Sequence, residues 1–549
     1  MVKSTTPYGT SSETIIQNRH RSTEQTELHP RYIGDMSTLP FLAQKFNFED
    51  SRFALPDGIK IRRFGQSLVI YEQGDNLNGR TPNQIVVEKL GILKPGEPVR
   101  DVDEWIFKVA NITKTTSDRL MKVYFAYIHP GLPVVNKTLF LNQYRDLADD
   151  FPSAPLLNAM YGAATRYIET CQLFGDLKAV TDAFDEDVSD WQIPEGGSER
   201  FFDNLITYVR GRYSPSIAVI QALIIAQNHR ASLDAKMTGS WLINGAAIRM
   251  AQDLGLHRST ETWQITEGEK ETRRRVWWAV YIMDKWSAAS TGRPQTIFDE
   301  DCDESYPNES ASWEEVMDTA SNVDDHQPRF PSLEKSVAQK AKGERIPIYQ
   351  PFVQLIKLSE ILGHVLQGLY TPRAKKYSAE HGSDAIVSYL DKALSDWRAA
   401  LPPTLQISGT NLRKLDSRGR TPLLSMSGLM YLSYCTLLIL LHRPFIEKEG
   451  GEKTKSSVSS LSICISAATR CVDVADSMHF RDFLLVSWNF AIYHVFTASL
   501  IHIHTASHAG SVVSDVAKSD LIKSVRVVKR LSNMSAAACQ IHQVLLRLM

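Results

Sequence analysis

The pattern of apolar and polar positions predicts helices along most of the chain from about Arg119 onward. The most informative stretch runs from Ser240 to Asp303 and reads as two helices followed by a loop. In the first helix apolar residues recur every four positions, so they share one slowly drifting stripe: Leu242, Ala246, Met250 and Leu254. The stripe predicts the face by which this helix packs.

Glycine and proline mark the ends of both helices. Gly255 follows the last apolar position of the first helix, where a left-handed glycine with Leu256 folding back forms a helix C-terminus. Gly292, with Pro294 two residues later, ends the second helix. The pattern therefore predicts two packed helices with charge at their ends.

The second helix carries the side chains that suggest chemistry. Glu271 and Arg275 are spaced for an i,i+4 pair, and Trp277, Tyr281 and Asp284 share a face. We considered two interpretations of this neighbourhood. The first is a ligand pocket with aromatic walls and orienting polar groups, formed by Trp241, Arg249, Trp277, Tyr281 and Asp284. The second, which we favour, is a set of buried ion pairs in which Arg249, Arg275 and Asp284 join the two helices.

Apolar stretches elsewhere predict buried helices. Pro215 precedes SIAVIQALIIAQNHR, which is apolar or small almost all round. Leu423 to Leu441 is nineteen residues long without a charge, long enough to span a membrane. Its four hydroxyl residues and the absence of an aromatic belt favour a buried core helix, and we expect no membrane partner. A second, weakly charged stretch follows at Phe483 to Ile501.

The fold class expected is all-α, a large bundle of antiparallel helices with a short extended or β N-terminal segment. Residues 1–31 lack apolar periodicity and read as a disordered tail, and residues 32–118 contain short strand patterns such as Leu68 to Tyr71. The helical domain is expected over residues 119–549, with acidic insertions at 184–200 and 299–343. From Asp299 to Asp325 the chain has eleven acidic residues and no Lys or Arg, which is typical of a solvated loop and less often of a disordered activation segment.

Composition and charge limit the partners. The net charge is -1 and 43% of the residues are hydrophobic, which describes a large globular protein with more than one core. A nucleic-acid-binding domain usually shows a clustered excess of Lys and Arg, and none is visible. Six scattered cysteines fit a reducing compartment rather than a disulfide framework.

Three separated motifs, in order, resemble the fungal-specific transcription factor domain, the middle homology region of zinc-cluster regulators. They are GAAIRMAQDLGLHR with ETRRRVWWAVYIMDKW and TGRP, then YLSYCTLLILLHRPFI at 431–446, then CISAATRCVDVA at 464–475. PVVNKTLFLNQY at 133–144 is similar to the entry to that domain. The resemblance covers roughly residues 120 to 500, and regulators of the xylanolytic-activator and cutinase-factor type are the most similar subgroup.

The resemblance implies sites of regulatory importance, and no catalytic, cofactor-binding or metal-binding residue. The candidates are the residues that match the motifs: Gly245, Arg249, Gly255, Leu256, His257, Arg258, Arg275, Trp277, Trp278, Asp284, Gly292, Arg293, Pro294, His442, Arg443 and Pro444.

The resemblance also implies a function: control of RNA polymerase II transcription in the nucleus by a helical regulatory domain that restrains or releases activation and is not an enzyme. Expected partners are the transcription machinery or coregulators, a second regulator in a homo- or heterodimer, and a small-molecule inducer. The family's zinc cluster needs six closely spaced cysteines, and no such set occurs between Met1 and Pro133. No cofactor is therefore expected within this chain, zinc is expected only with an upstream cluster, and DNA contact is expected only through a missing module or a partner.

Two alternatives remain. A cluster-less member could act as a corepressor or interaction protein that pairs with complete regulators. More remotely, DEDCD at 299–303 resembles the aspartate-rich magnesium motif of all-α terpene cyclases. His504 and His508 at i,i+4 could clamp a metal, but without a third ligand we interpret them as packing or solvated residues.

Overall fold

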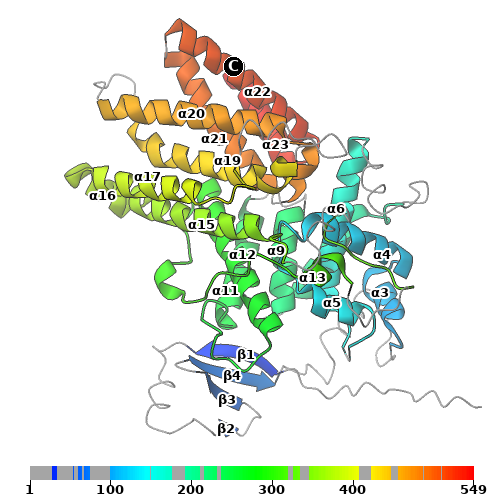
Figure 1. Cartoon of the computed structure of the whole chain (residues 1–549). Helices are drawn as coiled ribbons and strands as arrows, with labels where there is room; N and C mark the ends of the chain where they lie inside the picture. The colour runs from blue at the N-terminus through cyan, green and yellow to red at the C-terminus, as the bar shows by residue number, and fades with distance from the viewer. Residues whose placement is uncertain are drawn as a thin grey trace, which may run out of the picture.

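The computed structural model describes residues 28–33, 53–54, 60–64, 67–73, 99–148, 150–175, 192–210, 215–230, 237–319, 326–333, 345–406, 422–446, 455–485, 488–508 and 510–549. These residues form an α-helical body with a small antiparallel sheet beside it (Figure 1). The all-α fold class and its short N-terminal β segment are confirmed.

The sheet has four strands in the order β1-β4-β3-β2. They are β1 (Leu28–Ile33), β2 (Phe53–Ala54), β3 (Lys60–Phe64) and β4 (Ser67–Gln73). Leu28 pairs with Gln73 at one end of the β1–β4 ladder, and Ile33 pairs with Leu68 at the other. The expected boundary between residues 31 and 32 thus falls inside β1, and the division of the chain into domains stays a prediction.

The first group of helices begins at Val102, earlier than the expected start at 119. It contains α3 (Val102–Ala110), α4 (Lys114–Val123) with a π turn (Tyr124–Ile128), α5 (Lys137–Tyr144), α6 (Ala154–Leu173), α8 (Gly197–Val209) and α9 (Ile217–His229). Asp101, Thr113, Asn136 and Ser216 are N-caps whose side chains accept a backbone N–H of the first turn. Gly197, within the expected insertion 184–200, begins a helix instead, and residues 176–191 lie outside the described residues.

The central group contains α11 (Met237–Asp253), α12 (Glu267–Thr291), a 3-10 turn (Asp299–Asp301), α13 (Trp313–Met317) and α15 (Gln350–Val365), which continues into a π turn (Leu366–Tyr370). α12 packs against α9, α11 and α15, and β1 lies against α11 (Figure 1). α12 therefore occupies the middle of the molecule.

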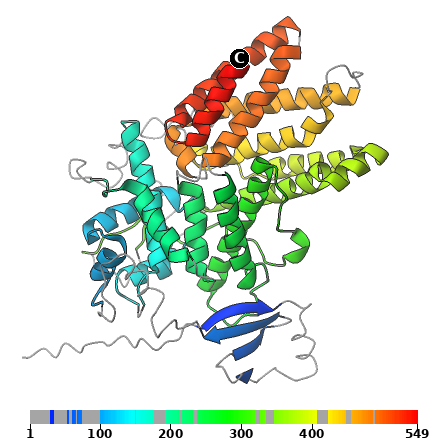
Figure 2. The same cartoon turned by 180° about the vertical axis from the view of Figure 1, so that it is seen from behind.

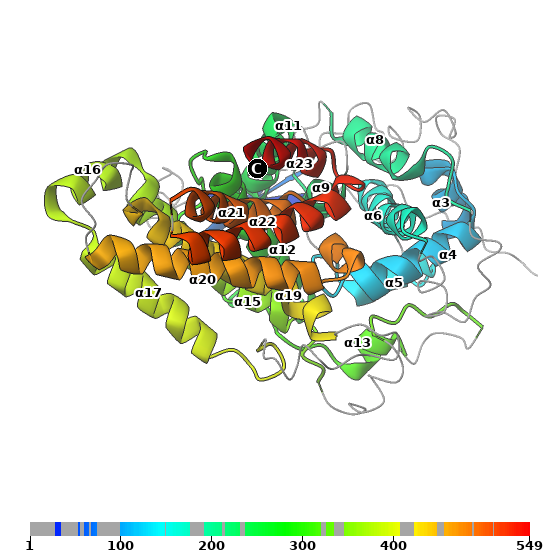
Figure 3. The same cartoon turned by 90° about the horizontal axis from the view of Figure 1, so that it is seen from above.

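The last group is a set of long helices that lies at the end of the molecule away from the sheet (Figures 1 and 2). It contains α16 (Pro372–His381), α17 (Asp384–Ala399), α19 (Pro422–His442) with a 3-10 turn (Arg443–Phe445), α20 (Lys455–Ser477), a further 3-10 turn (Phe480–Leu485), α21 (Trp488–His508), α22 (Ser511–Ser532) and α23 (Ala536–Leu548). Seen from above, α16 and α17 project at the end opposite α3 and α8 (Figure 3).

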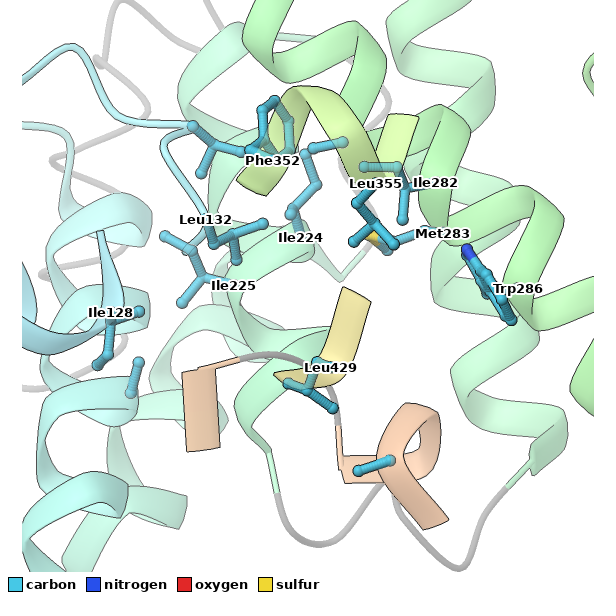
Figure 4. Packing of buried hydrophobic residues seen from close by; sticks show 14 of the residues in the cluster. Ile128, Leu132, Ile224, Ile225, Ile282, Met283, Trp286, Phe352, Leu355 and Leu429 are labelled. Carbon is cyan, nitrogen blue, oxygen red and sulfur yellow. The ribbon is translucent and has the colours of Figure 1, made fainter. Parts of the chain in front are cut away.

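One continuous hydrophobic core joins the three groups. Ile224 of α9, Ile282 and Met283 of α12, Leu355 of α15 and Leu429 of α19 meet near the centre (Figure 4). All five are less than one-tenth exposed. The family-like helix α12 is therefore a structural centre as well as a motif.

α19 is buried, as expected of a core helix. Among its described side chains, Leu432, Cys435 and Leu437 have no exposed surface, and α17, α20 and α21 pack against it. In the described part of the chain one segment, Val458–Ser477 of α20, is long and apolar enough to cross a membrane. A buried core helix passes the same test, and α20 contacts α19, α21 and α22.

The predicted packing face of α11 is right at its C-terminal end, where Leu254 is buried and Met250 packs against the core, and wrong at its beginning. Leu242 is 61% exposed and Ala246 is exposed, whereas Ala247, Ile248 and Ala251 are buried. A four-residue repeat drifts around a helix that has 3.6 residues per turn, so the first two residues of the stripe are exposed and the last two face the core.

Candidate functional site: helix α12 and the acidic strap

The chain reverses direction after α12 and runs back along the helix. Gly292 takes the left-handed conformation at φ 67°, as predicted for the helix end. The residues that follow then contact α12 in reverse order: Thr296 meets Asp284, Cys302 meets Trp277, and Asn308 meets Glu271. We call residues 295–318 the acidic strap.

Asp284 holds the beginning of the strap. Its carboxylate accepts hydrogen bonds from Thr296 N (3.1 Å), Thr296 Oγ1 (2.6 Å) and Ile297 N (2.9 Å). Lys285, which is 1% exposed, donates through Nζ to the carbonyl oxygen of Ile297. Burial lowers the pKa of Lys285, and the neighbouring Asp284 opposes that change.

The indoles and the phenol of α12 hold the middle of the strap. Trp277 Nε1 donates to Cys302 Sγ at 3.0 Å, and Trp278 Nε1 donates to the carbonyl of Ser305 at 2.8 Å. Tyr281 donates its hydroxyl to Asp299 Oδ1 at 2.5 Å. Burial, and then the charge of Asp299, raise the pKa of Tyr281 well above its usual value, so this phenol is a permanent donor.

Arginines neutralise the later carboxylates of the strap. Arg274 Nε lies 3.2 Å from Glu304 Oε1, and Arg258 Nε lies 3.0 Å from Asp303 Oδ1. Burial alone raises the pKa of a carboxyl group, but the hydrogen bonds from Arg258 and from the Ser259 N–H outweigh it and leave the pKa of Asp303 below its usual value. Several carboxylates of the strap are therefore paired with arginines, whereas Glu300, Asp301 and Glu314 are exposed, so the described part of the expected insertion 299–343 is only partly a solvated loop.

The far end of the strap joins a buried polar cluster. Arg275 stacks over the Tyr349 ring, with 4.2 Å to the ring centroid, and lies 2.8 Å from Glu271 Oε1 and 3.9 Å from Glu315 Oε1. Tyr349 donates its hydroxyl to Glu315 at 2.9 Å and lies 3.1 Å from His129 Nε2. The cluster thereby connects α12, α13, α15 and the π turn after α4.

Asp318 and Lys137 complete the attachment. Asp318, in the left-handed conformation at φ 56°, forms a buried two-pronged ion pair with Arg145. Lys137 donates to Val316 O at 3.2 Å and Ser332 Oγ at 2.9 Å, and its burial lowers its pKa to about 7. Val316 and Met317 of α13 also form a small apolar cluster with Ile346.

The strap also contacts a histidine whose pKa is raised in the folded protein. His364 Nε2 lies 3.0 Å from Asp299 Oδ2, and this hydrogen bond raises the pKa of His364 above 6.5. A histidine whose pKa is raised in the folded state stabilises the fold when protonated, so its contribution is complete below pH 6.5 and is lost as the pH rises through the raised value.

We therefore expect His364→Gln to lose stability mainly below pH 6.5, with the difference from the wild type shrinking at higher pH. Urea unfolding of both proteins across this range measures the difference. His381→Gln, on exposed α16, is the matched control and should show no such trend. A wild-type-to-variant difference independent of pH would contradict the assignment.

The expected ion pairs between α11 and α12 do not form. Arg249 is exposed and donates to Gln252 of its own helix at 2.8 Å. Arg275 and Asp284 are buried, but they pair with Glu271 and with the strap backbone. Both residues are buried and paired, as predicted. Their predicted partners were wrong, because the strap lies where α11 was expected.

The five residues considered as a ligand pocket do not form one here. Trp277 and Tyr281 are each 1% exposed, and the strap fills the space beside them. Trp241 lies instead beneath Arg293, whose guanidinium is 4.9 Å from the indole centroid. The five residues therefore do not line a common cavity.

The turn after α11 matches the predicted helix end. Gly255 is left-handed at φ 66°, and the Leu256 N–H returns to the Ala251 carbonyl at 3.0 Å. His257 packs against Trp277 with ring centroids 5.6 Å apart, and burial lowers its pKa to about 4. Gly245 is half-buried and Pro294 is exposed. Their contacts give neither residue a role at the strap.

The second motif lies apart from α12, at the end of α19. His442 Nε2 lies 3.4 Å from Asp391 of α17, and Arg443 donates to the Tyr370 hydroxyl at 3.2 Å, while Pro444 is exposed. The candidate residues thus fall into two places, the α12 strap and the α17–α19 contact.

Several residues of the site escaped sequence reasoning. Arg145, Lys137 and His129 bear on the strap from far upstream, and Tyr349 from downstream. One feature of the sequence could have signalled these contacts. Residues 299–325 contain eleven acidic residues and no Lys or Arg, so basic side chains elsewhere must pair with them.

Metal chemistry finds no support at the residues first considered. Asp299 and Asp303 point to different partners, and His504 and His508 stack with ring centroids 4.5 Å apart. Among the described residues no group of three or more His, Cys, Asp or Glu side chains is arranged to hold a metal ion. Cys464 and Cys471 are buried in the core.

Comparison with known proteins identifies a shared domain. Residues 121–399, about half of the chain, match the family model of the fungal specific transcription factor domain. The match includes α12 and the whole acidic strap.

Individual relatives agree with this match. The chain is 24% identical to cutinase transcription factor 1 alpha of Fusarium vanettenii over 76% of this chain and 41% of the relative. It is 24% identical to the transcriptional activator protein DAL81 of Saccharomyces cerevisiae over 72% of this chain and 39% of the relative. It is also 24% identical to the acetamidase regulatory protein of Aspergillus oryzae over 70% of this chain and 42% of the relative. The chain spans about two fifths of the length of these relatives.

Proposed function

Because the chain belongs to the family of the fungal-specific transcription factor domain, we propose that it is the helical regulatory body of a transcription regulator acting on RNA polymerase II. The names of its relatives are those of regulators rather than of enzymes. The match over residues 121–399 carries the proposal, since it spans the α12 core and the strap bound to it.

The architecture supports a body that presents surfaces rather than one that performs chemistry. The polar side chains of α12 are engaged with the strap: Asp284 with backbone N–H groups, Trp278 with a carbonyl and Arg274 with a carboxylate. Such saturated contacts rigidify a core and fix one arrangement of its helices. A rigid body of this kind suits the transmission of a binding event to a distant partner.

The proposal includes the cellular setting and the partners. The regulator acts in the nucleus, contacts DNA through a zinc-cluster module or through a partner regulator, and engages coregulators or the transcription machinery. Association with a second copy or with another regulator belongs to the same proposal.

Tethering tests the regulatory role. The full chain is fused to a heterologous DNA-binding domain in a fungal host that carries a reporter with the matching sites. We expect reporter output to differ by roughly fivefold or more from that of the DNA-binding domain fused to an inert protein of similar size, a change worth about 1 kcal/mol. The Asp301→Ala fusion, altered at an exposed strap residue, is the matched control and should behave as the wild type.

Unchanged output in this assay, with the fusion present at wild-type level in the nucleus, would refute a regulatory role for the body. Retention of the fusion outside the nucleus would refute the proposed location.

A further inference from the structure

A cavity of about 440 Å³ lies between α17 and α19, away from the strap. Its lining includes Ser395, Arg398 and Leu401 from the α17 side and Tyr431 and Tyr434 from α19. α17 and α19 lie side by side, and α20 packs on α19 (Figure 1). A cavity of this volume is within the range of small-molecule sites.

Aromatic rings form one wall of the cavity. Tyr431 and Tyr434 lie with ring centroids 5.8 Å apart, and Trp397 stacks on Tyr434 at 5.5 Å with 23° between the planes. The indole N–H of Trp397 is buried, and no acceptor among the described residues meets it. This rigid aromatic wall suits a flat apolar body, because aromatic faces pack well on planar groups.

Arg398 brings positive charge to the cavity. The guanidinium of Arg398 lies 5.9 Å from the centroid of the Tyr434 ring. Arg470, on α20, acts on the same phenols: burial raises the pKa values of Tyr431 and Tyr434, and both arginines oppose that rise. Neither arginine forms an ion pair with a carboxylate of the described residues, although most arginines around α12 do.

No lining residue of the cavity carries a negative charge. A cationic ligand would find no counter-ion in it, whereas an anion would meet the guanidinium group of Arg398. Guanidinium groups bind carboxylates through paired N–H donors, with a geometry that a lysine cannot offer. The chemistry of the wall therefore selects both an anionic end and a flat apolar body.

We propose that the cavity between α17 and α19 binds a small aromatic carboxylate, with its carboxylate at Arg398 and its ring against Tyr431 and Tyr434. Binding of the carboxylate does not depend on the proposed function. A role of the cavity as an inducer site rests on that function. The site adjoins the family-like end of α19, where His442 contacts Asp391 of α17. A ligand in the cavity would thus bear on a contact that joins the same two helices.

Binding to the purified full chain tests the site. The probes are benzoate, cinnamate and indole-3-carboxylate, each compared with its primary amide, by saturation-transfer NMR at millimolar concentration, where fragments of this size bind. We expect saturable binding of at least one carboxylate, and at least roughly tenfold weaker binding of its amide, because the charged hydrogen bonds are lost. Equal binding of acid and amide, or no binding by any of the three acids, overturns the proposal.

Variants locate the site. Arg398→Gln changes an exposed side chain, so the fold should persist, and it should weaken carboxylate binding by roughly tenfold or more. Arg373→Gln, on exposed α16, is the matched control and should bind as the wild type. Wild-type binding by Arg398→Gln overturns the assignment.

The two proposals fail separately. A chain that changes reporter output when tethered but binds none of the probes refutes the ligand site and leaves the regulatory role intact. A chain that binds the carboxylate through Arg398 but leaves the reporter unchanged supports the site and refutes the regulatory role.

Discussion

Replacing Asp284 with alanine lowers the free energy of unfolding by roughly 3–5 kcal/mol, the largest effect we expect from one substitution in α12. The carboxylate is 4% exposed and accepts from three donors at the start of the strap, at Thr296 and Ile297. Its removal leaves those donors without an acceptor and leaves Lys285 buried without the negative charge 4.0 Å away. Equilibrium unfolding in urea measures the loss.

Asp284→Asn separates charge from hydrogen bonding. The amide keeps one oxygen acceptor, so we expect an intermediate loss of stability. Asp301→Ala, at an exposed position of the same strap, is the matched control and should cost less than about 0.5 kcal/mol. Equal stabilities of Asp284→Ala and Asp301→Ala would contradict the role given to Asp284.

Asp318→Asn lowers the free energy of unfolding by about 3–5 kcal/mol, because it leaves the guanidinium of Arg145 buried without its counter-ion. Both side chains are 4% exposed, and Asp318 also accepts from the Phe330 N–H at 2.9 Å. Asparagine tolerates the left-handed backbone at this position, so the substitution tests charge rather than strain.

A double-mutant cycle with Arg145→Met isolates the pair. We expect a coupling energy of roughly 2–3 kcal/mol, since two close and buried partners are not additive. The exposed pair Arg526 and Asp476, at 3.3 Å with the arginine 60% exposed, is the control and should couple by less than about 1 kcal/mol. Additive losses at Arg145 and Asp318 would show that the strap end does not depend on their contact.

The attachments of the strap at Asp284 and Asp318 can also be tested for an effect on function. Asp284 fixes the first residues of the strap and Asp318 the last, so each variant frees one end while the other stays bound. A variant that folds and leaves the strap loose should change reporter output in the tethering assay if the strap is part of the regulatory surface.

The sequence alone determined the elements whose signals are local. The ends of α11 and α12 followed from Gly255 and Gly292, which both take the left-handed conformation. The burial of α19 followed from its uncharged apolar composition, and the family followed from motifs that keep their order along the chain. A helix end or a buried helix is encoded in adjacent residues, so it can be read without the rest of the fold.

The tertiary structure decided what depends on partners distant in sequence. An acidic run looks solvated until Arg145, Arg258 and Arg274 are seen to reach it from three other places. The predicted stripe of α11 drifts around the helix, and only the neighbouring helices determine that Met250 and Leu254 are covered while Leu242 is not. The cavity beside Tyr434 arises in the same way, since α17, the residues after it and α19 each contribute one part of it and no one segment carries its pattern. Local sequence patterns determine where helices end and which helices are buried. Ion pairs and cavities depend on residues that only the folded chain brings together.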